Sequence, residues 1–334
     1  MVITVVVPTY QRSQDLMRCL DALKLQTRKP DEVLVIIRDS DSQTWNFLKG
    51  YDFAPLPLQT VTVKVPGQVA ALNAGLDIAR GDIIAITDDD AAPHTEWLAR
   101  IEKHFLLDER VGGVGGRDWV YIGTTLQDAA KHPGASKVVG KVQWTGRVVG
   151  NHHVGEGEAR CVDVLKGANM SYRRSAIGNL RFDSRLRGTG AQVHNDLGFS
   201  LAISKAGWKL IYDPLVSIDH YLGERHDEDQ RQSFNFIACT NAVYNETLIL
   251  LDYLSAVKRL IFLLWAVLVG TRLAYGLVQY LRFLPKEGVI AQQKLLAAMS
   301  GRWQAWQTWQ TWQEGKHRLS KVAYIQTLTS GETE

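Results

Sequence analysis

Short runs of apolar, mostly β-branched residues alternate with helical patterns in the first third of the chain. These runs are continuous, as in strands buried on both faces of a sheet, and lie at 2–7, 33–37, 61–63 and 83–86. Between them, apolar positions at 16–23 and 69–79 predict two helices, the first with Ser13 as its N-cap and the second ending near Gly81. Strands separated by helices predict a parallel, doubly wound α/β sheet, whose ligand lies beyond the carboxyl ends of the strands.

The pattern weakens in the middle of the chain. Glycines are frequent and periodicity is low from Gly112 to Gly157, so we expect irregular strands and loops there. A second compact block follows at 163–221, with a helix predicted at 196–206 and a strand at 209–212.

The composition becomes strongly apolar after residue 235. The segment 260–281 has a single charge, Arg272, and is long enough to cross a bilayer. On one continuous helix its polar and basic residues share about a third of the circumference, which is typical of a helix lying in a membrane interface; they are Lys258, Arg272, Gln279, Arg282 and Lys286. A spanning helix in an oligomer and a buried core helix fit the same pattern.

Four tryptophans mark the last part of the chain, in the short repeat W-Q-x at Trp303, Trp306, Trp309 and Trp312. Indole rings favour the headgroup boundary of a membrane, and they also form protein contacts. Both interpretations of the repeat stay open at this point.

Composition and charge exclude several classes of protein. With 46% hydrophobic and 22% charged residues, the chain has the composition of a globular protein. Its net charge of +3 is too balanced for a protein whose main partner is nucleic acid. The three cysteines are far apart and form no C-x-x-C pair, which argues against a disulfide scaffold or a cysteine zinc site. The first residues enter a strand directly, so no cleaved export signal is expected.

An acidic triplet, Asp88-Asp89-Asp90, is the sharpest local signal for chemistry. Three carboxylates after a buried strand repel one another unless a cation lies among them, and such oxygen ligands suit Mg²⁺ or Mn²⁺. The alternative is an acidic turn before a helix that starts near Thr95.

An ordered set of motifs extends this signal over residues 1–225. On these motifs the chain resembles the family 2 glycosyltransferases of the GT-A fold, a Rossmann-like α/β fold. The matching blocks are Val5–Tyr10 with Arg12, Leu20–Gln26, Glu32–Val35, Ala71–Gly75, Ala79–Asp82, Thr87–Asp90, Gly167–Arg173, His194–Asp196, Lys205–Trp208, Tyr212–Pro214 and His220.

The resemblance implies an inverting transfer of one sugar from a nucleotide-diphosphate sugar, with Mn²⁺ or Mg²⁺ as cofactor. The residues that it assigns to the nucleotide and donor are Pro8, Thr9, Tyr10, Arg12, Asp39, Asn73, Asp88 and Asp89. It assigns Asp88, Asp90 and His220 to the metal and Asp196 to the general base. These roles are chemically consistent, because a cation neutralises the diphosphate leaving group and a base takes the proton of the acceptor hydroxyl.

The chain departs from the family pattern at three places. Ile37 and Arg38 precede Asp39 where two acids are common, and Asn195 stands where a glutamate usually precedes the base. From the residues alone, the favoured interpretation of Asp196 is a helix N-cap before Leu197. The Q-x-x-R-W motif of processive synthases is absent, since Met299 stands three residues before Arg302, so we expect single additions.

The resulting expectation is a GT-A catalytic domain at 1–235, with a donor half at 1–110 and an acceptor and base half at 111–235. Membrane-associating helices at 236–290 and a Trp-rich helical tail at 291–334 follow. We expect a UDP-sugar donor, a lipid-linked or polysaccharide-precursor acceptor, a place on the cytoplasmic face of a membrane, and C-terminal helices suited to a homo-oligomer. The alternatives are an inactive sugar- or nucleotide-binding protein of the same fold, and a sugar nucleotidyltransferase.

Overall fold

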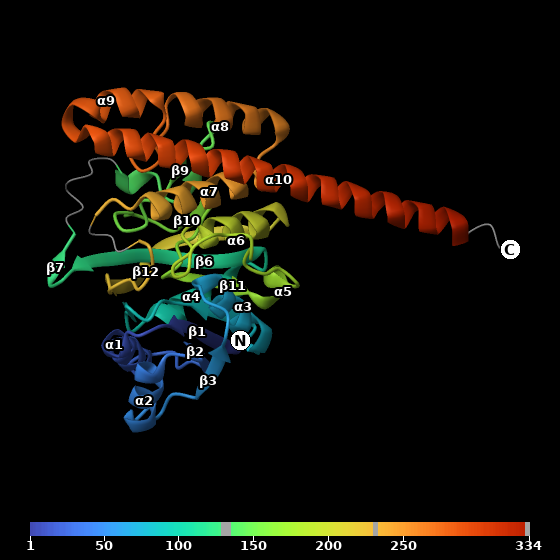
Figure 1. Ribbon diagram of the computed structural model, residues 1–334. Coiled ribbons are helices and arrows are strands. Elements are labelled where there is room, and N and C mark those ends of the chain that lie inside the picture. Colours follow the sequence, from blue (N-terminus) through green and yellow to red (C-terminus); the bar gives the residue numbers. More distant parts are fainter. Residues whose placement is uncertain (128–134, 230–232, 331–334) are drawn as a thin grey trace. The chain divides into compact units, whose positions relative to one another are not determined.

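The computed structural model describes residues 1–127, 135–229 and 233–330, with side chains of the last helix described as far as residue 315. The chain forms two compact units, Met1–Asn235 and Phe236–Glu334 (Figure 1).

The first unit is built on a ten-stranded mixed sheet with strand order β10-β12-β6-β11-β4-β1-β2-β3; β5 pairs with β12 and β7 with β6. The strands are β1 (Ile3–Thr9), β2 (Glu32–Arg38), β3 (Leu58–Val63), β4 (Ile83–Ile86), β5 (Ala91–Pro93), β6 (Val111–Ile122), β7 (Thr125–Leu126), β10 (Arg160–Val162), β11 (Met170–Arg173) and β12 (Lys209–Tyr221). A small second sheet pairs β8 (Lys141–Val142) with β9 (Val148–Val149). The helices are α1 (Ser13–Lys24), α2 (Ser42–Gly50), α3 (Gln68–Ile78), α4 (Trp97–Leu107), α5 (Arg174–Ile177) and α6 (Asn195–Lys205), with a 3₁₀ turn η2 at Ala135–Lys137.

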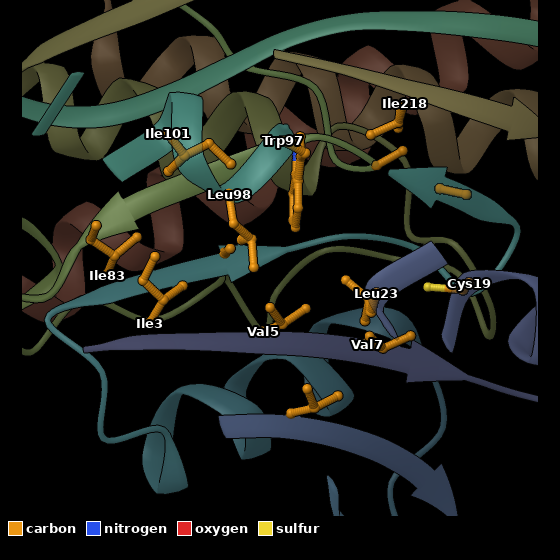
Figure 2. Packing of buried hydrophobic residues seen from close by; sticks show 14 of the residues in the cluster. Ile3, Val5, Val7, Cys19, Leu23, Ile83, Trp97, Leu98, Ile101 and Ile218 are labelled. Carbon is orange, nitrogen blue, oxygen red and sulfur yellow. The ribbon is translucent and has the colours of Figure 1, made fainter. Parts of the chain in front are cut away.

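Strand β1 lies in the middle of the sheet and is buried on both faces, as its continuous apolar run predicts. Ile3, Val5 and Val7 point to the face that holds α1 and α4, where Leu23 and the fully buried Trp97 complete the core (Figure 2). Val6 points to the opposite face, against α3, where a Cβ on Gly75 would lie 2.6 Å from the Val6 side chain. The predicted α/β sheet and its four N-terminal strands are confirmed.

Strand β6 corrects the expectation of irregular structure after Gly112. Residues 111–122 form one long strand between β11 and β12. Its glycines are required by close neighbours: a Cβ on Gly113 would lie 2.6 Å from Leu210, and one on Gly116 would overlap the carbonyl oxygens of Val216 and Asp213. The low periodicity therefore reflects tight packing of a central strand and not a loop.

Strand directions determine where the loops gather. Strands β1, β2, β3 and β4 are parallel, β11 is antiparallel to both β4 and β6, and β12 is parallel to β6. Strands β6 and β12 therefore run in the same direction as β1 and β4. The carboxyl ends of these four strands, and the residues that precede β11, all lie at one edge of the sheet.

The second unit is helical, with α7 (Phe236–Tyr253), α8 (Ala256–Leu268), α9 (Leu277–Glu287) and α10 (Val289–Ser330). Helix α10 packs along α7 through small residues: Ala298 and Ala305 are fully buried, and a Cβ on Gly301 would lie 2.6 Å from the Thr240 carbonyl oxygen. This close approach explains why the helix carries glycine at that position.

The expectation of a single helix at 260–281 is wrong. Helix α8 ends at Leu268 and α9 begins at Leu277, and between them Gly270 takes φ +68° while its backbone pairs with Tyr275. Among the described helices, none is both long and apolar enough to cross a membrane. The basic stripe drawn on one continuous helix is therefore divided between two helices.

Candidate active site

A pocket of about 480 Å³ opens at the sheet edge where the strand ends gather. This volume lies in the range of small-ligand sites. It collects most of the residues predicted from the sequence, which are Pro8, Thr9, Tyr10, Arg12, Asp88, Asp90, Asp196 and His220. They come from both halves of the first unit, and several are more than 100 residues apart in sequence.

The acidic triplet divides its three side chains between the pocket and the protein interior. Asp88 lines the pocket, and its Oδ1 accepts a hydrogen bond of 2.9 Å from Gln68 Nε2. Asp90 also lines the pocket, and its Oδ2 lies 2.9 Å from the Arg12 guanidinium. Asp89 is fully buried, pairs with Arg12 and is not a lining residue. Asp89 is therefore linked to the pocket through its ion pair with Arg12, and its role in donor binding stays a prediction.

His220 lies between two carboxylates. Its Nε2 atom is 3.3 Å from Asp90 Oδ1, and its Nδ1 atom is 3.6 Å from Asp118 Oδ2. Asp118 is fully buried in β6, and its Oδ2 is 2.5 Å from Lys166 Nζ. The chain thus forms a continuous row of alternating charges from Asp90 through His220 and Asp118 to Lys166.

Burial and neighbouring charges shift the pKa values of these groups in opposite directions. Burial raises the pKa of Asp89 to about 7 despite the attraction of Arg12. Burial works against ionisation of Asp90 too, but the imidazole of His220 holds the pKa of Asp90 well below its usual range. Against the effect of burial, Asp118 and Asp90 raise the pKa of His220 to about 9. His220 and Arg12 thus place positive charge beside these carboxylates.

The residues fit a divalent cation. One ligand atom each from Asp88, Asp90 and His220 lie within 4.8 Å of one another. Asp90 Oδ1 and His220 Nε2 are buried without a hydrogen-bond partner, although they lie 3.3 Å from each other. Two carboxylate oxygens and an imidazole nitrogen form a donor set suited to a metal such as Mn²⁺. Among the described residues this is the one His, Cys, Asp and Glu cluster with such spacing.

Asp196 lies in the first turn of α6 and lines the same pocket. The alternative interpretation as an N-cap is wrong, since His194 holds that position with φ +74°. Asp196 Oδ2 instead accepts a hydrogen bond of 3.0 Å from the Gly167 amide, in the segment before β11. This bond and one of 2.8 Å from the Leu197 amide to Oδ1 fix the carboxylate, and Asp196 stays partly exposed.

Besides Asp89, two of the residues predicted to bind the nucleotide or donor lie outside the pocket. Asp39 is exposed after β2, and the preceding residue, Arg38, lines the pocket in its place, with its guanidinium 5.8 Å from the centre of the Tyr10 ring. Asn73 exchanges two hydrogen bonds with the backbone of Phe182, at 2.8 and 3.0 Å, and so joins α3 to the loop before α6. The structure gives Asn73 a structural contact and leaves its predicted donor role without support.

Sequence reasoning missed Asp118, Lys166 and the loop at 222–227 that also lines the pocket. In this loop, His226 packs edge-on against Tyr10 with ring centroids 6.1 Å apart. Asp118 belongs to no local sequence motif that would mark it as a site residue, because its partners Lys166 and His220 are distant in sequence. Lys166 had a signal, since it immediately precedes a family block.

Comparison with known proteins decides the family. The sequence pattern of Glycosyl transferase family 2 matches residues 4–177, more than half of the chain. The chain belongs to this family. As a family 2 glycosyltransferase it is 29% identical over 104 residues to the glycosyltransferase AglE of Haloferax volcanii, covering 29% of this chain and 33% of AglE. It thus spans about a third of that relative's length.

Other relatives align over more of the enzyme. The amylovoran biosynthesis glycosyltransferase AmsB of Erwinia amylovora is 25% identical over 224 residues, which cover 64% of this chain and 68% of AmsB. Among solved structures, S. aureus TarS with UDP-GlcNAc superposes with a TM-score of 0.59 at 16% identity, covering 91% of this chain and 81% of that one. The mannosyltransferase PcManGT of Pyrobaculum calidifontis, bound to GDP-Man and Mn²⁺, has a TM-score of 0.56 at 18% identity, over 90% and 87% of the two chains. At these identities the structural likeness establishes the shared fold.

Proposed function

We propose that this glycosyltransferase moves a single sugar, with inversion, from a nucleoside-diphosphate sugar to a lipid-linked or polysaccharide-precursor acceptor. UDP is the proposed nucleotide. The solved TarS structure contains UDP-GlcNAc and that of PcManGT contains GDP-Man, so both donor classes belong in a test. The relative named for amylovoran biosynthesis supports a glycan precursor as acceptor.

One observation carries the proposal: a single pocket holds both the candidate metal ligands and a separate carboxylate. Asp88, Asp90 and His220 converge within 4.8 Å, and Asp196 lines the same cavity from another element. Sugar transfer by single displacement needs these two functions, charge neutralisation at the leaving group and a base for the acceptor.

The chain's own residues would divide the work at the donor. A divalent ion held by Asp88, Asp90 and His220 would neutralise charge on the departing diphosphate. Arg12 keeps Asp90 in place through its 2.9 Å ion pair. Tyr10 and Arg38 form one wall of the pocket beside the end of β2, where a nucleotide base and ribose would be held.

Asp196 would act as the general base. Its Oδ2 accepts a hydrogen bond from the Gly167 amide and its Oδ1 accepts one from the Leu197 amide, and it carries no ion pair among the described contacts. Each carboxylate oxygen keeps a further lone pair that could accept the proton of an acceptor hydroxyl. In single displacement the base removes a proton from the hydroxyl that attacks the sugar from the side opposite the diphosphate. Asp196 lines the pocket from α6 and does not belong to the cluster of candidate metal ligands, which supports a separate role as base.

Asp118 and Lys166 would act as positioning residues. Asp118 faces the ring nitrogen of His220 opposite to the one directed at Asp90, and Lys166 balances its charge. Carboxylates in this position orient a metal-binding histidine and fix its tautomer.

The test is a donor screen on the full chain, with UDP- and GDP-sugars, scored by the nucleoside diphosphate released with Mn²⁺, Mg²⁺ or EDTA. Metal-dependent release that requires an acceptor supports the proposal. Release of pyrophosphate would identify a nucleotidyltransferase, and donor binding without any release across the acceptors would identify an inactive binding protein.

A further inference from the structure

Helices α8 and α9 of the second unit expose an unusual amount of apolar surface. On α8, Val257, Leu260, Leu264 and Leu268 are exposed by 70, 60, 55 and 51%, and their spacing places them on one face of the helix. The opposite face of α8 contains its two buried residues, Phe262 and Ala266.

Helix α9 repeats this arrangement and has no buried side chain at all. Leu277, Val278, Leu281 and Leu284 are exposed by 44, 50, 65 and 37% and share one face. Leu273, in the connection between the helices, is 88% exposed. In Figure 1, α9 and α8 (orange) follow one another along α10 (red). Contacts with α10 agree with this order, since Lys294 pairs with Glu287 and the Arg259 guanidinium lies 5.0 Å from the Trp309 ring.

The charges from the start of α8 to Lys286 are all positive, and Glu287, which ends α9, pairs with Lys294. From Tyr253 to Lys286 the sequence contains five basic residues and no aspartate or glutamate. Lys258, Arg272, Arg282 and Lys286 are exposed, and none of them forms an ion pair with a carboxylate in the described part of the chain. On α9, helical spacing places Arg282 at the edge of the apolar face next to Val278, and Lys286 lies one turn after Arg282 on that side of the helix, farther from the leucines.

We propose that the α8–α9 surface, defined as the exposed apolar residues of 257–284 with Lys258, Arg272, Arg282 and Lys286, binds an anionic lipid bilayer and lies in the plane of its surface. Charge favours this occupant. An anionic bilayer complements basic side chains that have no carboxylate partner among the described residues and lie on the same helices as the exposed leucines, whereas a second copy would bring the same positive charges together. The two short helices and the turn at Gly270 fit an in-plane arrangement. This inference concerns the second unit and is independent of the proposed sugar transfer.

The test is flotation of the full-length protein with vesicles of phosphatidylcholine alone or mixed with equimolar phosphatidylglycerol, at low and high salt. We expect binding to the mixed vesicles, which weakens with salt. Each lysine or arginine side chain near an anionic surface strengthens binding about fivefold, so the variant R282Q/K286Q should bind roughly 25-fold more weakly. The variant L264Q/L281Q should lose about tenfold per leucine, since each leucine loses burial in the acyl boundary.

Matched controls are K103Q and L107Q, at exposed positions of α4 in the first unit; both should bind like the unchanged protein. Circular dichroism checks that each variant is folded, which is expected because the substituted side chains are exposed. The proposal is overturned if the protein binds neither vesicle type, or if the control substitutions lower binding as much as the α8–α9 variants do. It is also overturned if the protein forms a lipid-free dimer that L264Q/L281Q dissociates, because the surface would then join two copies.

Discussion

Replacement of Asp118 by asparagine tests how much of the proposed metal site depends on residues that are not among its candidate ligands. Asp118 is fully buried, its carboxylate lies 3.6 Å from His220 Nδ1, and its charge is balanced by Lys166 at 2.5 Å. Asparagine keeps the shape of the side chain but removes the charge that holds the imidazole in its orientation.

The expected magnitude follows from that geometry. Loss of a carboxylate that orients a metal-binding histidine lowers metal affinity by about 10–100-fold. Removing one partner of a fully buried ion pair costs about 3–5 kcal/mol of unfolding free energy. Here the Lys166 side chain is 33% exposed and can regain water, so we expect about 1–3 kcal/mol.

Mn²⁺ binding to the full chain is measured in the presence of UDP, with the free ion quantified by electron paramagnetic resonance. The unfolding free energy of the same proteins is measured by urea titration. Asp213→Asn is the matched control, because Asp213 forms a carboxylate–histidine pair with His104 at 2.7 Å and does not line the pocket. It should lose stability but keep its Mn²⁺ affinity. Mn²⁺ affinity of Asp118→Asn within threefold of the unchanged protein, or equal losses in both variants, would refute the positioning role.

Three further changes probe the metal, the base and the packing of β6. Asp90→Ala should abolish Mn²⁺-dependent donor binding in calorimetry and keep the fold; unchanged donor affinity with Mn²⁺ would contradict the metal assignment. Asp196→Asn should keep donor binding while kcat falls by about 10²–10⁴, the usual contribution of a general base, and turnover within a few-fold of normal would place the base elsewhere. Gly116→Ala should lower the unfolding free energy by about 3 kcal/mol, since a Cβ there meets backbone oxygens that cannot move away cheaply. Gly50→Ala, with open space around the Cβ, should be nearly neutral in the same urea titration.

The N-terminal half of the fold was predictable from the sequence because its signals are local. Continuous apolar runs gave β1, β2 and β4 within a residue or two, and the carboxyl-end rule brought Pro8–Tyr10 and Asp88 to one edge. Strand β6 was not predictable in this way, because glycine disfavours strands in general and the close neighbours that require it here come from β11 and β12.

The helix break in the second unit had a sequence signal that apolar content obscured. Gly270 and Gly276 bound the turn, and a Cβ on Gly276 would lie 2.7 Å from the Ala266 carbonyl oxygen. Arg302 then donates hydrogen bonds to the carbonyl oxygens of Ala274 and Tyr275, at 3.0 and 2.8 Å, which holds the turn against α10. Hydropathy alone treats residues 260–281 as one apolar segment. The contacts that divide this segment come from α10, which lies further along the chain.

The direction of β11 explains why half of the active site could be predicted and half could not. In a purely parallel sheet, the residues before a strand lie at the edge opposite to the ligand, so Lys166 would be placed far from Asp88. Because β11 is antiparallel to both β4 and β6, its preceding segment lies at the carboxyl edge, and Lys166 and Gly167 enter the pocket there. The same reversal places β6 and β12 parallel to β4, which brings Asp118 and His220 to the end of the acidic triplet. Strand direction depends on pairings between segments about a hundred residues apart, and a single sequence carries no local record of those pairings.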